Sequence, residues 1–106
     1  MKLDPSEANS YNAAAWLRAT CPDERYRDGK KAVTSATTAC ELSTWKESYT
    51  IDTLAAACAE SGDFSSAIKW QEKAIALATK DSDKPDMLIR FGLYTEDKPY
   101  REMPKQ

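Results

Sequence analysis

The sequence contains no histidine, only three glycines and no long apolar run. Without histidine, the chain lacks the side chain that most often serves as an acid or base near neutral pH and most often binds zinc. No glycine-rich phosphate loop is present. No window approaches the roughly 18 apolar residues of a membrane-spanning helix, and the opening MKLDP does not begin an apolar signal segment. We therefore expect no membrane partner, and a cytoplasmic protein or a domain cut from a longer one.

The three cysteines, Cys21, Cys40 and Cys58, are widely spaced and form no CxxC motif. Their odd number and spacing favour neither a disulfide framework nor a cysteine-only zinc site, so we predict no metal and no cofactor. Cys40 and Cys58 lie on apolar stripes and are expected to pack as small hydrophobic residues. Cys21 ends a predicted helix, where the negative end of the helix dipole disfavours a thiolate, so Cys21 is a poor candidate nucleophile. A redox role remains an alternative.

Charge and composition narrow the functional classes. The net charge is only -2, and no run of like charges occurs, which argues against nucleic acid as a partner. With 106 residues, 42% of them apolar and 30% charged, the chain is expected to form one folded domain. The adjacent carboxylates Asp23 and Glu24 lie in a predicted loop and do not face each other across a cleft. We therefore predict that the protein is not an enzyme.

Apolar periodicity predicts helices and no strands. Asp4, Asp28 and Asp63 each stand where an N-cap residue would begin a helix, and Gly62 can end one in the left-handed conformation. A charged turn is expected over residues 22–27. The predicted helices span about residues 5–20, 29–42, 49–61, 64–77 and 85–95.

An internal repeat organises these helices. A shift of 35 residues superimposes the second helix on the fourth, and a shift of 40 superimposes the first on the third, so the first turn carries extra residues. A shift of 37 places Ile51 on Leu88, a partial third copy. The sequence therefore predicts one all-α domain, a short superhelix of two helical hairpins and a capping helix. Its parts are repeat 1 (about 5–43), repeat 2 (about 48–80), the capping helix (about 85–95) and a tail (96–106).

Small residues occupy the positions where two helices of a hairpin would cross. The pair Leu54-Ala55, the turn at Gly62, and Ala67 with Ala74 resemble the tetratricopeptide repeat (TPR), whose helices need such residues to approach closely. The runs AWLRATCPDERYRDGKKA and LAAACAESGDFSSAIKWQEKA, with the closing KPYRE, resemble a bacterial subgroup of these proteins. Cys58 and Gln71 replace aromatic residues that are common in the family. Another helix-hairpin solenoid, such as a Sel1-like array, is the competing interpretation.

The resemblance implies a protein-protein interaction module. Such domains bind an extended peptide or a partner helix in a concave groove lined by the first helix of each hairpin. Carrying the lining positions over gives these candidate residues: Asn12, Trp16, Thr20, Tyr49, Asp52, Thr53, Ala56, Glu60 and Arg90.

The chemistry of these positions suggests what they would bind. Trp and Tyr often supply binding energy, and the carboxylates of Asp52, Glu60 and Asp86 would favour a basic ligand. Only Asn12 and Arg90 could clamp a terminal carboxylate, so that specificity is not expected. Trp16 has an equally good interpretation as a core residue.

Self-assembly is the alternative function. Repeat arrays generally need about three units for stability, and this chain has two and a capping helix. Exposed repeat ends could therefore pair as a homodimer, or a hairpin could swap between chains.

Overall fold

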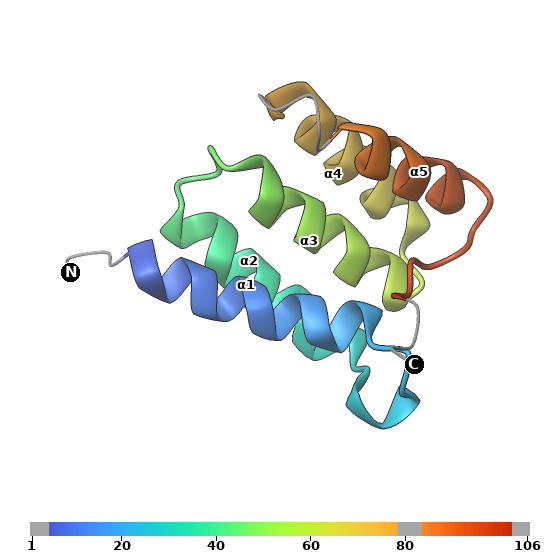
Figure 1. Cartoon of the computed structure of the whole chain (residues 1–106), viewed down its shortest axis with the longest axis horizontal. Helices are drawn as coiled ribbons and strands as arrows, with labels where there is room; N and C mark the ends of the chain where they lie inside the picture. The colour runs from blue at the N-terminus through green and yellow to red at the C-terminus, as the bar shows by residue number, and fades with distance from the viewer. Residues whose placement is uncertain (1–4, 79–83, 103–106) are drawn as a thin grey trace.

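A computed structural model describes residues 5–78 and 84–102, which contain five α-helices and one short 3-10 helix (Figure 1). No strand occurs in these two ranges. The predicted all-α fold is therefore confirmed, with helix boundaries that differ from the predicted ones by only one or two residues at any end. The elements are α1 (Pro5–Thr20), η1 (Glu24–Tyr26), α2 (Gly29–Leu42), α3 (Ser48–Glu60), α4 (Phe64–Leu77) and α5 (Lys84–Thr95).

The helices pack as two hairpins and a closing helix. Helix α1 lies against α2, and α3 lies against α4, while α3 also contacts both helices of the first hairpin (Figure 1). Helix α5 packs on α4 and reaches α3. Helix α3 is thus the central element, and it positions the capping helix relative to the first hairpin.

Aspartate caps begin the second helix of each hairpin, as the sequence predicts. The Asp28 carboxylate accepts a hydrogen bond from Lys31 N at 3.1 Å, and the Asp63 carboxylate accepts one from Ser66 N at 3.1 Å. The side-chain and backbone hydrogen bonds from Ser66 hold the pKa of Asp63 below its usual value. Gly62 has φ of +91° and reverses the chain before the second cap. The predicted cap Asp4 lies outside the described residues.

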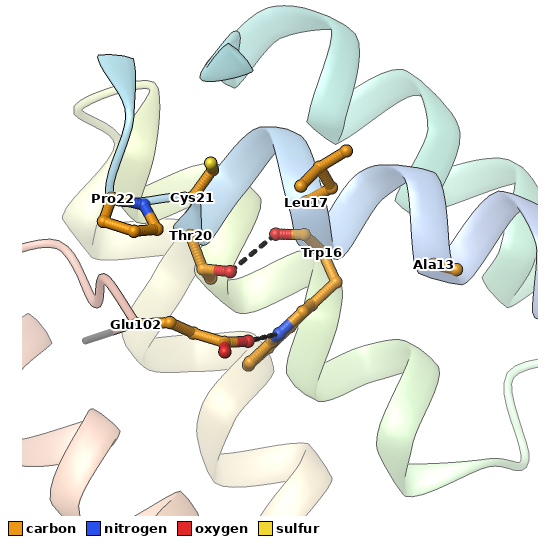
Figure 2. A pocket seen from close by; sticks show the side chains of 7 residues that line it. All are labelled: Ala13, Trp16, Leu17, Thr20, Cys21, Pro22 and Glu102. Carbon is orange, nitrogen blue, oxygen red and sulfur yellow. Dashed lines mark hydrogen bonds between the residues drawn. The ribbon is translucent and has the colours of Figure 1, made fainter. Parts of the chain in front are cut away.

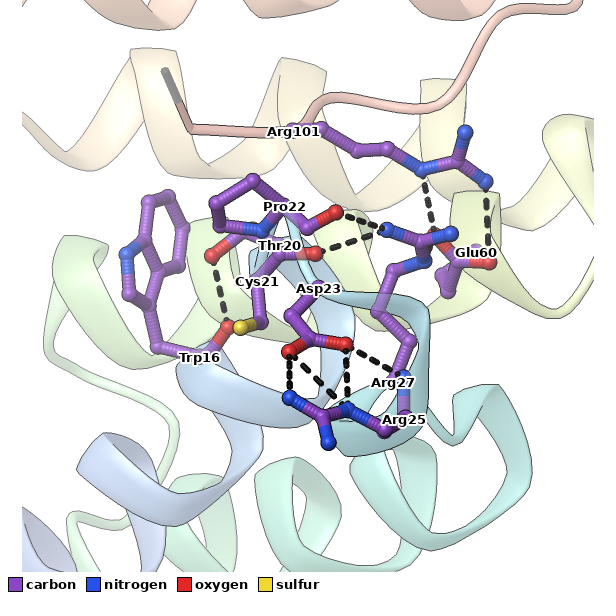
Figure 3. Close-up of polar contacts among 9 residues, drawn as sticks. All are labelled: Trp16, Thr20, Cys21, Pro22, Asp23, Arg25, Arg27, Glu60 and Arg101. Carbon is purple, nitrogen blue, oxygen red and sulfur yellow. Dashed lines mark hydrogen bonds and ion pairs between the residues drawn. The ribbon is translucent and has the colours of Figure 1, made fainter. Parts of the chain in front are cut away.

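The long turn between α1 and α2 holds more structure than the charged loop that the sequence predicts. It contains η1, and the Arg27 Nη1 atom donates to the carbonyls of Cys21 at 2.8 Å and Pro22 at 3.1 Å. The same guanidinium lies 3.6 Å from the Glu60 carboxylate at the end of α3 (Figure 3). The long turn of the first repeat therefore contacts the second repeat through Arg27 and Glu60.

Small side chains allow α3 to be surrounded. Every residue from Thr50 to Ala59 is buried, and four of the last five are alanines. Cys40 of α2 and Cys58 of α3 are part of this core, and burial raises the pKa of each thiol to about 11. Both cysteines therefore pack as hydrophobic residues, as predicted.

The linker between the hairpins is filled by Trp45. Its indole stacks on that of Trp70 from α4, with ring centroids 5.2 Å apart and an interplanar angle of 23°. The backbone N–H of Trp45 donates to the Cys40 carbonyl at 2.8 Å and helps to close the end of α2. Trp45 is therefore a packing residue between repeats, as its position in the sequence suggests.

The backbone at Gly29 lies close to the backbone that follows α3, and this contact supports a prediction. A Cβ atom there would lie 2.7 Å from Ser61 N and 2.8 Å from Ser61 Cα. Because backbone atoms cannot rotate away, Gly29→Ala should push α2 from the end of α3 and lower the free energy of unfolding by about 1–3 kcal/mol, measured in urea. Gly92→Ala is the matched control, since nothing other than its chain neighbours and the nearby backbone of its own helix lies within 4 Å of its Cβ position. It should be neutral or stabilise by up to about 1 kcal/mol through helix propensity. Equal losses in both variants would contradict the close approach.

Candidate functional site

The nine predicted groove residues lie on α1, α3 and α5, but most are covered. Tyr49 is 40% exposed, and its hydroxyl donates to Asn9 of α1 at 3.0 Å. Asn12, Trp16 and Glu60 are half-buried. The other five predicted groove residues are buried by the elements that pack around them, so the groove is not an open surface in this structure. The buried positions are Thr20, Asp52, Thr53, Ala56 and Arg90.

Asp52 and Arg90 form a buried ion pair between α3 and α5. Arg90 Nε lies 3.1 Å from Oδ1 of Asp52, and Nη2 lies 2.9 Å from Oδ2. Burial alone would lower the pKa of Arg90, but the charge and hydrogen bonds of Asp52 outweigh it and raise that pKa. The predicted ligand-binding carboxylate Asp52 is therefore already balanced by the predicted groove residue Arg90.

Residues 96–102, here called the C-terminal segment, turn back from α5 toward the end of α1 (Figure 1). The Tyr100 ring lies 5.8 Å from the ring of Trp16. The Arg90 guanidinium contacts both rings, at 5.4 Å from Trp16 and 5.2 Å from Tyr100. Trp16, Arg90 and Tyr100 thus form a cluster in which a cation meets two aromatic faces.

Two further residues of the segment anchor it. Glu102 N donates to the Thr20 carbonyl at 2.8 Å, and its carboxylate accepts a hydrogen bond from Trp16 Nε1 (Figure 2). The Thr20 carbonyl ends α1 and has no partner within that helix, so the segment supplies the missing donor. Arg101 donates to both oxygens of Glu60, from Nε at 3.2 Å and Nη2 at 3.3 Å (Figure 3). Glu60 therefore lies between Arg101 and Arg27.

A cavity of about 320 Å³ opens beside Glu102 (Figure 2). Its walls are mainly apolar, and the Trp16 indole and the Glu102 carboxylate lie at one side. Leu17 is 52% exposed beside it. The cavity therefore offers space for an apolar side chain next to the C-terminal segment. The lining residues are Ala13, Trp16, Leu17, Thr20, Cys21, Pro22 and Glu102.

Sequence reasoning placed the tail outside the site and did not find Tyr100, Arg101 or Glu102. The only available signal was the run KPYRE, which places a rigid proline, an aromatic residue and two opposite charges in consecutive positions. It also missed Tyr94 of α5, whose side chain is fully buried. Burial and the nearby Asp52 charge raise the pKa of the Tyr94 hydroxyl, so it stays neutral.

In the ranges 5–78 and 84–102, no three His, Cys, Asp or Glu side chains gather as metal ligands. No helix in the described part of the chain is both long and apolar enough to cross a membrane. Comparisons with known protein families, curated proteins and solved structures found no match.

The Asp52–Arg90 pair supports a second prediction. Asp52→Asn leaves a buried guanidinium without its counter-charge, so the free energy of unfolding in urea should fall by about 3–5 kcal/mol. Adding Arg90→Met should recover part of this loss, with a coupling energy of about 1–3 kcal/mol in a double-mutant cycle. Glu72→Gln, which removes an exposed carboxylate from α4, is the control and should change stability by less than about 0.5 kcal/mol. Strict additivity of the two losses would show that the pair is not coupled.

Proposed function

We propose that the chain is a non-catalytic protein-interaction module of the TPR type, which binds an extended peptide on the face formed by α1, α3 and α5. One observation carries the proposal: the C-terminal segment already lies on this face, held by both backbone and side-chain contacts. A surface that holds the irregular chain of residues 98–102 has the shape and the hydrogen-bonding groups to hold a similar segment of another protein.

The contacts indicate which peptide groups the face can bind. The Thr20 carbonyl accepts a hydrogen bond from a backbone N–H. This hydrogen bond does not depend on the sequence of the ligand. Trp16 and Arg90 can bind an aromatic ring of the ligand, as they contact the Tyr100 ring. The expected preference for basic ligands rests on Glu60, whose partner Arg101 is part of the segment and can be replaced. Asp52 contributes little to this preference because Arg90 balances its charge.

Membership of the TPR family is supported by the repeated hairpin. Both hairpins begin their second helix with an aspartate cap, and both bury the alanines at the matching crossing positions, Ala32 with Ala67 and Ala39 with Ala74. Such repeats present extended binding surfaces rather than catalytic clefts. The absence of an enzymatic activity is part of the same proposal.

Binding can be tested with the full chain. A peptide array that compares basic, acidic and apolar sequences should show a preference for basic peptides that contain an aromatic residue. Titration of the best peptide should shift the amide NMR signals around Thr20, Glu60 and Arg90 but not those around Thr34 on α2. Trp16→Ala should weaken binding about tenfold or more, because indole rings often dominate binding energy. Tyr26→Ala, which removes an exposed aromatic residue from η1, should have no effect. Shifts confined to α2 would overturn the proposal.

Self-assembly is the second candidate, and one observation favours it. The two ends of the array expose large apolar side chains, with Leu17 of α1 52% exposed and Leu88 and Ile89 of α5 55% and 61% exposed. If these ends associate, light scattering should give a mass above 11.8 kDa that returns to this value in Ile89→Lys. A mass of 11.8 kDa at all concentrations would exclude this candidate, and a dimer that buries Trp16 would exclude the first.

A further inference from the structure

We infer that the C-terminal segment is a built-in competitor for the binding face, and that the external ligand is a partner-protein peptide with an aromatic, a basic and an acidic residue in consecutive positions. This inference rests on the proposed function, because it names the ligand class and the regulation of the same face. The ligand binds in an extended conformation and reproduces the contacts of Tyr100, Arg101 and Glu102.

Each of the three residues meets a different group of the domain. Tyr100 lies against the Trp16 ring and the Arg90 guanidinium. Arg101 pairs with Glu60, and the Glu102 carboxylate accepts from the Trp16 indole N–H. The receptor groups are therefore an aromatic–cation surface, a carboxylate and an indole donor, and they complement an aromatic ring, a base and an acid.

The order of these contacts requires an extended ligand. In an extended chain, successive side chains point to opposite sides and alternate ones share a side. Tyr100 and Glu102 both contact Trp16, whereas Arg101 between them reaches Glu60 on α3. Residues 98–102 form no helix or turn. A helical ligand would place the first and third residues on different faces, so it could not satisfy Trp16 twice.

The segment is held by contacts that can be exchanged. The Arg101 side chain is 45% exposed, and ion pairs at such positions contribute little to stability. The segment follows α5 directly and reverses direction at Asp97, which adopts φ of +58°. Since the segment is tethered, it competes at a high effective concentration despite weak individual contacts. A free peptide binds only the fraction of molecules in which the segment has left the face.

The test uses the full chain and a fluorescein-labelled peptide with the sequence DKPYRE, measured by fluorescence anisotropy. In the opened variant, Tyr100→Ala with Arg101→Ala, the segment loses its ring and its base. We expect this variant to bind the peptide about tenfold or more tightly than the natural chain, because the competitor is weakened. A permuted peptide, DKPERY, should bind the opened variant at least about tenfold more weakly than DKPYRE.

The matched control is Arg25→Ala with Tyr26→Ala, which removes an exposed arginine and tyrosine from η1. It should bind DKPYRE as the natural chain does. Arg101→Ala alone changes only an exposed side chain and should shift affinity in the same direction as the opened variant, so a folding defect in the double variant does not end the test.

The outcomes separate the two proposals. Equal affinities for the natural chain, the opened variant and Arg101→Ala would overturn the competitor role and leave the binding face intact. Equal binding of DKPYRE and DKPERY would overturn the aromatic–basic–acidic order. If the natural and opened chains bind no peptide of the array and neither test peptide, the proposed function itself fails.

Discussion

Close packing around α3 is the constraint on which the other parts of the structure depend. Helix packing distances are set by the side chains at the contact, and α3 carries small residues where it meets α1, α2 and α4. Ala55, Ala56, Ala57 and Ala59 are all buried, so neighbours can approach from several sides at once. Gly29 extends this close approach to the backbone at the end of α3. The position of α5 relative to α1, and with it the proposed binding face, follows from this packing.

Asp52 is the buried charged residue of this alanine-rich helix, and it pairs with Arg90 of α5. A buried carboxylate without a partner is costly, which makes the bidentate contact between Asp52 and Arg90 a structural requirement. Arg90 also turns its guanidinium toward Trp16 and Tyr100. The ion pair that joins α3 to α5 thereby supplies part of the surface on which the C-terminal segment lies. The contact that stabilises the capping helix and the contact that holds the C-terminal segment share the Arg90 side chain.

The proposed binding face combines contacts made within the helices with contacts made by the C-terminal segment. Asp52 and Arg90 pair between α3 and α5 without any residue of the segment. Glu60 keeps Arg27 as a partner from the long turn, so its charge stays partly balanced when Arg101 leaves. The Thr20 carbonyl has no donor within α1 and accepts a backbone N–H from Glu102, a contact that does not depend on the side chain of the donor residue. In the proposed exchange, one segment would therefore replace another without leaving a buried charge isolated.

The sequence by itself determined the helices and their pairing. Aspartate caps, the left-handed Gly62 and the spacing of alanines act within a few residues, and their repetition along the chain predicted two hairpins and a capping helix. The same register placed candidate residues on α1, α3 and α5. It could not predict their exposure, because the burial of Thr53 or Ala56 depends on helices elsewhere in the chain. Nor could it place Glu102 beside Trp16, 86 residues earlier. Only the tertiary structure decided that the tail covers the groove, since contacts between distant residues leave no local periodicity in the sequence.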